Sequence, residues 1–202
     1  QHGTFDYGTD GPGAVKYNLD LSEKGIGSGL YALDPSDTSA SPDGIGQGAE
    51  IRLYEDANGV IHGRLTEHGA DYFTISVNSS GTVTFTQQKN IWHANTGSDD
   101  DSQTLTLDRG EWLRLVQTLT DADGDKDSAF IDLGRGVFKI EDDGPNAVAA
   151  NCDIPVLKLD ESPEPYAGDG DRSTTANFAA NFNLQHGTFD YGTDGPGAVK
   201  YN

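Results

Sequence analysis

Apolar and polar residues alternate in many short segments of the chain. In the first of them, Val15, Tyr17, Leu19 and Leu21 are separated by polar residues. Alternation with a period of two places every second side chain on one face of a β-strand. The same pattern predicts strands around residues 51–53, 73–77, 83–85, 105–107, 113–115, 129–133, 138–140 and, after Pro155, 156–160.

The segments between these strands have the composition of turns. Asn78-Ser79-Ser80-Gly81 stands between two alternating segments and predicts a hairpin. No window of 11 or more residues carries the apolar stripe of a helix. Short strands separated by clusters of Gly, Asn, Asp and Ser are typical of an antiparallel β-sandwich. The sequence therefore predicts an all-β fold.

An exact internal repeat indicates how the chain is organised. Residues 1–18 and residues 185–202 both read QHGTFDYGTDGPGAVKYN, an offset of 184 residues. Eighteen identities in eighteen positions do not arise by chance. We interpret the chain as one full period of a tandem array plus the start of the next period, with a duplication introduced by cloning as the alternative.

Composition narrows the possible partners. The chain has 33 acidic and 13 basic residues, a net charge of −20, and 26 glycines among its 202 residues. A protein that grips nucleic-acid backbones needs a basic surface, and an anionic membrane repels an acidic one. Cys152 is the only cysteine, so the chain cannot form an internal disulfide. We therefore expect no nucleic-acid partner, no membrane insertion, and bound cations as a source of rigidity.

Changes of composition suggest three parts. We expect residues 1–143 to form most of one sandwich, 144–155 to be a linker, and 156–202 to be the beginning of the next repeat. On this interpretation the sandwich lacks strands that its own repeat would supply. Residues 151–184 of another copy could fill the open edge by strand exchange.

Several motifs together resemble a known family. NIWH at 90–93, TLTDADGD at 118–125 and EDDGP at 141–145 are similar to motifs in the extender repeats of giant RTX adhesins, which are bacterial surface proteins exported by type I secretion. The resemblance is strong over residues 1–145 and looser over 154–184. It implies an Ig-like or cadherin-like β-sandwich in tandem, extracellular on the bacterial surface, with neighbouring repeats as partners and calcium near their junctions.

Clusters of carboxylates are the candidate metal ligands. The first contains Asp121, Asp123, Asp125 and Asp127, with only Lys126 among them as a compensating charge. Clustered like charges destabilise a folded loop unless a hard cation with oxygen ligands neutralises them. The spacing is not that of an EF-hand, because Lys126 occupies the position where that loop requires glycine. A solvated acidic turn is the alternative.

Two further clusters flank the predicted linker. Asp142 and Asp143 precede it, and Asp160 and Glu161 follow it. In a cadherin-like array, carboxylates on the two sides of a linker share Ca²⁺. We therefore expect ions held among these two clusters and the Asp121–Asp127 cluster to fix the angle between neighbouring repeats. We expect Asp99 to Asp101 to form a solvated loop, and Asp6 and Asp10 to serve turn chemistry around Gly11-Pro12-Gly13.

The remaining residues indicate no catalytic chemistry. The five histidines have no zinc-binding spacing, and oxygen clusters favour calcium. No nucleophile motif or phosphate loop is present, so we expect a protein that is not an enzyme. Trp92 and Trp112 are expected to pack in or beside the sheets rather than to stack on a sugar. The leading hypothesis is a calcium-stabilised structural extender of a surface adhesin, and the alternative is a module of the same adhesin that binds a glycan or peptide.

Overall fold

The structure, a computed structural model, describes residues 5–40, 44–95, 98, 101–145, 147, 149, 153–159 and 173–182. The chain divides into two compact units, unit 1 at residues 1–142 and unit 2 at residues 143–202. Unit 1 is all-β with antiparallel sheets, and its described residues contain no α-helix. The predicted all-β, sandwich-like fold is therefore confirmed.

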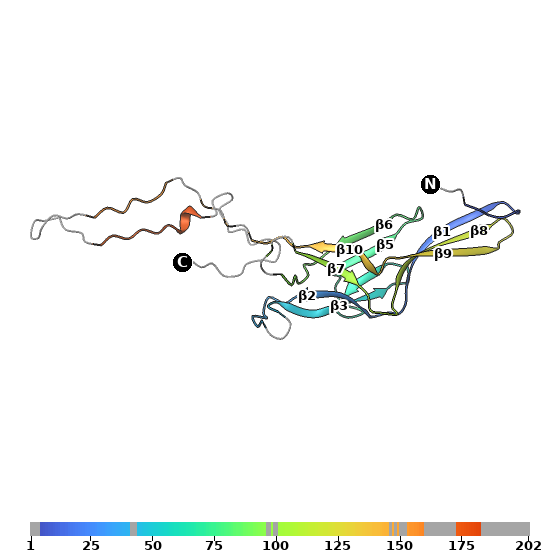
Figure 1. Ribbon diagram of the computed structural model, residues 1–202, viewed down its shortest axis with the longest axis horizontal. Coiled ribbons are helices and arrows are strands. Elements are labelled where there is room, and N and C mark those ends of the chain that lie inside the picture. Colours follow the sequence, from blue (N-terminus) through green and yellow to red (C-terminus); the bar gives the residue numbers. More distant parts are fainter. Residues whose placement is uncertain are drawn as a thin grey trace, which may run out of the picture. The chain divides into compact units, whose positions relative to one another are not determined.

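Among the described residues of unit 1, ten strands form three sheets (Figure 1). The five-stranded sheet has the order β2-β3-β4-β5-β6, and the smaller sheets have the orders β1-β8-β9 and β10-β7. The strands are β1 (Pro12–Leu21), β2 (Ile26–Leu33), β3 (Gln47–Glu55), β4 (Ile61–Arg64), β5 (Phe73–Val77), β6 (Val83–Gln87), β7 (Ser102–Thr106), β8 (Leu113–Asp121), β9 (Lys126–Asp132) and β10 (Arg135–Glu141).

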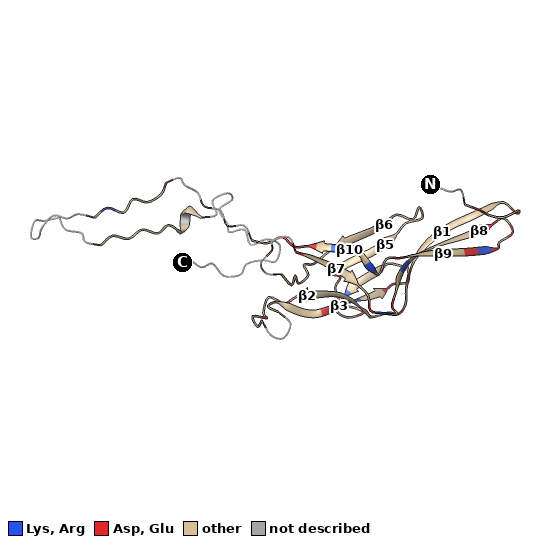
Figure 2. Ribbon diagram, viewed as in Figure 1, with Lys and Arg blue, Asp and Glu red and all other residues tan. Residues whose placement is uncertain are grey.

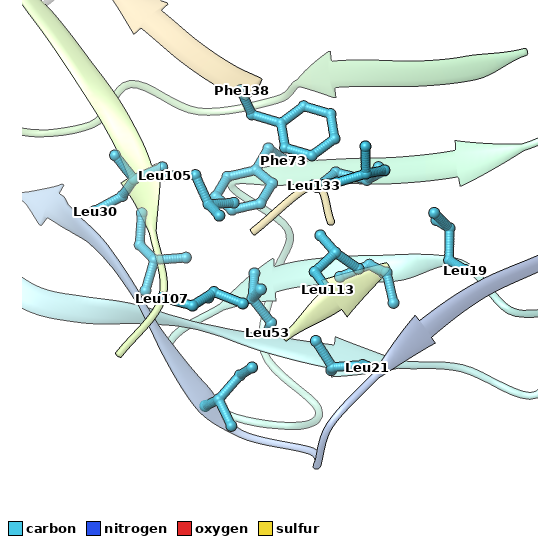
Figure 3. Close-up of a cluster of buried hydrophobic side chains, with 14 of the residues drawn as sticks. Leu19, Leu21, Leu30, Leu53, Phe73, Leu105, Leu107, Leu113, Leu133 and Phe138 are labelled. Carbon is cyan, nitrogen blue, oxygen red and sulfur yellow. The ribbon is translucent and has the colours of Figure 1, made fainter. Parts of the chain in front are cut away.

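The core lies between these sheets. Alternate residues of the strands point inward, so that Leu53, Phe73 and Leu113 are fully buried while Leu19 and Phe138 are almost so (Figure 3). Each fully buried side chain of this size contributes about 1.5–3 kcal/mol to folding. A short alternating pattern is enough to build this core because each sheet needs only one apolar face.

The predicted hairpin at Asn78–Gly81 is present between β5 and β6. The side-chain oxygen of Asn78 accepts hydrogen bonds from the backbone N–H groups of Ser80 at 3.0 Å and Thr82 at 2.9 Å. Gly81 has a φ of +83°, a conformation that glycine adopts without steric cost. The turn residues named by the sequence therefore hold β5 and β6 in register.

One strand prediction holds for position without burial, and another needs correction. The strand predicted at 129–133 corresponds to β9, but its apolar residues form no buried face, since Ile131 is 63% exposed and only Leu133, just after the strand, is buried. In the described sheet β9 has β8 as its one partner strand. A strand was predicted at 156–160, but residues 156–159 belong to no strand in the structure, and Val156 is 90% exposed; residue 160 lies outside the described residues. A strand requires a hydrogen-bonded neighbour, and the described part of unit 2 has only the bridge between Ala149 and Phe182 and the 3₁₀ turn η1 (Ala179–Asn181).

Candidate metal centre

The turn between β8 and β9 is organised by one carboxylate. Oδ1 of Asp121 accepts hydrogen bonds from the backbone N–H groups of Gly124 at 3.0 Å and Asp125 at 2.8 Å. The N–H of Asp121 in turn donates to the carbonyl of Asp125 at 3.0 Å. Gly124 adopts a φ of +105°, which a residue with a Cβ rarely does. The sequence Asp-Ala-Asp-Gly-Asp thus forms a defined turn from its own side chains.

Strand pairing brings Asp10 to this turn. Pro12 of β1 is in register with Asp121 of β8, and the N–H of Ala122 donates to the carbonyl of Gly11 at 3.2 Å. As a result, carboxylate oxygens of Asp10, Asp121 and Asp123 all lie within 4.8 Å of one another. We call these three residues the acidic triad. Asp10 and Asp123 are exposed and Asp121 is half-buried.

The acidic triad fits the geometry of a calcium site. Ca²⁺ binds oxygens at 2.3–2.6 Å, so two ligands of one ion are at most about 5 Å apart. The separations within the triad satisfy this limit. Three carboxylates provide part of the 6–8 oxygens that Ca²⁺ takes. In calcium sites of proteins in general, backbone carbonyls and water supply the others. Hard oxygen donors without nitrogen or sulfur favour calcium or magnesium over zinc.

The charge state of Asp121 is consistent with a role as a ligand. Its pKa is lowered, first by a hydrogen bond with the side chain of Asp123 and then, against partial desolvation, by the backbone N–H groups of Asp125 and Gly124. A close contact between two carboxyl groups needs a proton between them, or a cation in its place.

Two other predicted ligands line a hollow beside the acidic triad. Its volume is about 180 Å³, and its walls are Asp6, Tyr7, Leu119, Asp121, Asp125, Lys126 and Asp127. Asp121 belongs to both the triad and the hollow. The carboxylate of Asp127 also accepts the N–H of Ser128 at 2.8 Å. All four residues of the first predicted cluster therefore gather at one end of unit 1, where the ribbon in Figure 2 is coloured red for acidic residues.

The second predicted cluster is at the opposite end of unit 1. Asp142 follows the last residue of β10, and its N–H donates to the carbonyl of Asp101 at 2.8 Å. Figure 1 shows the end of β10 and the β8–β9 turn at opposite ends of this unit. The expectation that one group of ions joins Asp142 to the β8–β9 turn is therefore wrong within unit 1. Asp143 is the first residue of unit 2, and Asp160 and Glu161 lie outside the described residues.

In the loop before β7, the carboxylate of Asp101 accepts hydrogen bonds from neighbouring residues of the same segment. Oδ2 of Asp101 accepts the N–H of Asn95 at 3.1 Å and Nε2 of Gln103 at 2.9 Å. The pKa of Asp101 is lowered, chiefly by its hydrogen bond from Asn95. Asp99 and Asp100 lie outside the described residues.

Both tryptophans are engaged within the fold. Nε1 of Trp92 donates to the carbonyl of Ile45 at 2.9 Å, and its ring packs edge-to-face on Tyr31. Nε1 of Trp112 donates to Asp20 at 2.8 Å, while the guanidinium of Arg114 lies over its ring. These contacts agree with the prediction that both rings pack against the sheets.

Sequence reasoning missed Asp10 as a partner of the turn. It assigned both Asp6 and Asp10 to turn chemistry, and Asp6 does accept the N–H of Gly8 at 3.0 Å. The missing information was the pairing of β1 with β8, in which Pro12 is opposite Asp121 although the two are far apart in the sequence. One signal in the sequence could have indicated this role. Asp10 stands just before an alternating segment, and a residue at the start of a strand lies beside the loop that ends the neighbouring antiparallel strand.

Comparison with known families gives one assignment. Residues 2–134 match the model of a family described as a domain of unknown function, DUF5801. The chain belongs to this family. The DUF5801 match contains β1 to β9 and the whole acidic triad. The family description states no function.

Two further findings complete the comparison. No curated protein matched the chain, and no solved structure matched it. Within the described residues, no helix combines the length and apolar character needed to cross a bilayer.

Proposed function

We propose that this DUF5801 chain is a calcium-stabilised structural repeat of a large bacterial surface adhesin. Its task is to extend the adhesin from the cell, so its partners are the neighbouring repeats of the same chain and it catalyses no reaction. The single observation that carries the calcium role is the acidic triad, in which two exposed and one half-buried carboxylate lie within 4.8 Å of one another.

The internal repeat supports an extending role. The second copy of residues 1–18 includes Asp194, the counterpart of Asp10. In repeat proteins, near-identical units add length and each contacts mainly its neighbours. A ligand-binding module, by contrast, does not need to be copied without change.

The net charge of −20 supports a need for cations outside the cell. Self-repulsion among so many carboxylates destabilises a compact state. Extracellular calcium modules bind with dissociation constants of about 10⁻⁴–10⁻³ M. Such sites fill at extracellular calcium concentrations, so the proposed ion would stabilise the repeat after export.

Thermal unfolding with and without calcium tests the proposal. At about 10 mM Ca²⁺ and the affinities above, binding to the folded state alone adds about 1.4–2.7 kcal/mol. For a unit of this size that raises the melting temperature by roughly 3–10 °C relative to EDTA. Equal melting temperatures in the two buffers would refute the calcium role.

Matched variants locate the site. Asp123→Asn keeps the size of the side chain and removes one charge of the triad, so it should reduce the calcium-dependent rise. Glu23→Gln removes one exposed charge after the other end of β1 and should leave that rise intact. Equal loss in both variants would mean that calcium acts through general charge screening.

The alternative, a module that binds a glycan or peptide, has weaker support. A second described hollow, lined by Tyr17, Leu115, Gln117, Ala129, Phe130 and Ile131, has a volume of about 140 Å³. Ligand pockets usually measure about 300–1,000 Å³. Saturable binding on a glycan array would favour the module over the extender.

A further inference from the structure

Strand β9 forms an open edge of its sheet. In the order β1-β8-β9 it pairs with β8 on one side, and no other described strand lies on its second side (Figure 1). All seven of its residues are exposed, including Phe130 at 58% and Ile131 at 63%. An exposed edge with apolar side chains is a template for pairing with another strand.

The hydrogen-bond pattern identifies which residues face this edge. Leu133 donates its N–H to the carbonyl of Leu113, and Asp121 donates to Asp125, across the two ends of the β8–β9 hairpin. Together with the continuous register, these bonds show that the backbone N–H and C=O groups of the odd-numbered residues of β9 point towards β8. The backbone groups of Lys126, Ser128, Phe130 and Asp132 therefore point to the open edge. The N–H of Ser128 donates to the carboxylate of Asp127 and not to β8, which is consistent with this direction.

We propose that β9 pairs with β9 of a second copy of this chain, antiparallel and about a two-fold axis at Ala129. This register places Lys126 opposite Asp132 of the second copy at both ends of the pair, and Ser128 opposite Phe130. All four outward-facing residues then meet outward-facing partners, as an antiparallel ladder requires. Shifting the register by two residues either way moves Lys126 away from Asp132 and leaves both charges unmatched.

The side chains also suit this register. Phe130 of one copy lies diagonally across from Phe130 of the other, at a spacing of about 7–8 Å that aromatic rings can bridge. The guanidinium of Arg114 lies 4.0 Å from the centroid of the Phe130 ring and holds it against the sheet. Opposite charges at the strand ends and two aromatic rings near the axis make the edge self-complementary.

Sedimentation of the full chain tests the pairing. One strand pair buries less than the roughly 1,200 Å² of a stable interface, so we expect a dissociation constant of about 0.1 mM. Lys126→Glu and Asp132→Lys each place like charges opposite one another twice, and each alone should weaken the dimer about tenfold or more. Mixing the two variants restores opposite charges at both ends, so the mixture should form heterodimers.

A disulfide provides a second measurement, because Asp132 also accepts the N–H of Gly134 and its replacement could disturb that turn. In a Cys152→Ser background, Ala129→Cys places two thiols opposite each other at the axis, where Cα atoms about 4.5 Å apart allow a disulfide. Val137→Cys, on the exposed part of β10, is the control. We expect rapid cross-linking at position 129 and slow cross-linking at position 137.

Three results would overturn the proposal. The wild-type chain could remain monomeric up to about 1 mM, ten times the expected dissociation constant. A wild-type dimer could survive Lys126→Glu unchanged, as it would if residues 153–159 of the second copy occupied the edge. Finally, Ala129→Cys could cross-link no faster than the control.

Discussion

Gly63 lies beneath an aromatic ring and offers a test of how the core is packed. It belongs to β4, where it is paired with Leu53 of β3 and Phe73 of β5. A Cβ added at Gly63 would lie 2.5 Å from Cε1 of Phe73 and closer still to Cζ. Phe73 is fully buried and packs edge-to-face on Phe85 with ring centroids 5.4 Å apart, so its ring has no free space to enter.

We therefore expect Gly63→Ala to destabilise unit 1. Forcing one methyl group into a packed core costs about 1–3 kcal/mol. The reduced entropy of the unfolded chain offsets about 0.4–1 kcal/mol of this. The expected net loss is about 1–2 kcal/mol in the free energy of unfolding, measured by urea denaturation of the full chain.

A second substitution should reverse part of the effect. Phe73→Leu alone removes buried ring atoms and should cost about 1–2 kcal/mol. Leucine also vacates the space that the new methyl group of Gly63→Ala needs, so the double variant should be more stable than the sum of the single losses by about 1 kcal/mol. Gly69→Ala is the comparison with less crowding, because its added Cβ would lie 3.0 Å from the hydroxyl of Thr66, on a side chain that can turn, and 3.2 Å from the carbonyl oxygen of Thr66, with no atom as close as the Phe73 ring is to Gly63. Strict additivity of Gly63→Ala and Phe73→Leu would refute this account of the core.

Other predictions concern buried and charged groups. Ser28 is fully buried and its hydroxyl donates to the carbonyl of Ile51 at 2.5 Å, so Ser28→Ala should lower the free energy of unfolding by about 1–3 kcal/mol in the same denaturation assay. The pKa of Asp56 is lowered to about 2, chiefly by the backbone N–H of Val60, from an ordinary value of 3.8. Because its folded pKa is depressed, its stabilisation is present above about pH 4 and lost as the pH falls towards 2; in Asp56→Ala the unfolding free energy should depend less on pH in that interval. Asp10→Asn should reduce the calcium-dependent rise in melting temperature, and a rise equal to that of the wild type would exclude Asp10 as a ligand.

Strand positions and the acidic turn were largely readable from the sequence. The alternation at 15–21 corresponds to β1, and those at 73–77 and 83–85 correspond to β5 and β6. The signal is strong because each of these strands has one buried and one solvated face, which imposes a period of two. Strands β2 and β4 were not predicted. Both contain glycine, as at Gly29 and Gly63. Because glycine has no side chain, it is neither clearly apolar nor clearly polar, and it interrupts the alternation that identifies a strand.

The candidate site could be predicted only in part. Asp121 and its neighbours are close in sequence, and glycine among clustered carboxylates identifies an acidic turn. Asp10 joins them only through the β1–β8 register. The separation of Asp142 from this turn also follows from topology, since β8 and β10 end at opposite ends of unit 1 (Figure 1).

By itself, the sequence determined the all-β class of the fold, the repeated segment, the charge of −20 and the acidic turn, because each depends on residues that are neighbours in the chain or on their total. Tertiary structure alone decided that Asp10 completes the triad, that Phe73 lies over Gly63, and that β9 stands at an open edge. These features depend on which strands pair and in what register. Pairing is selected by burial of the whole core at once, so no local pattern of residues specifies it.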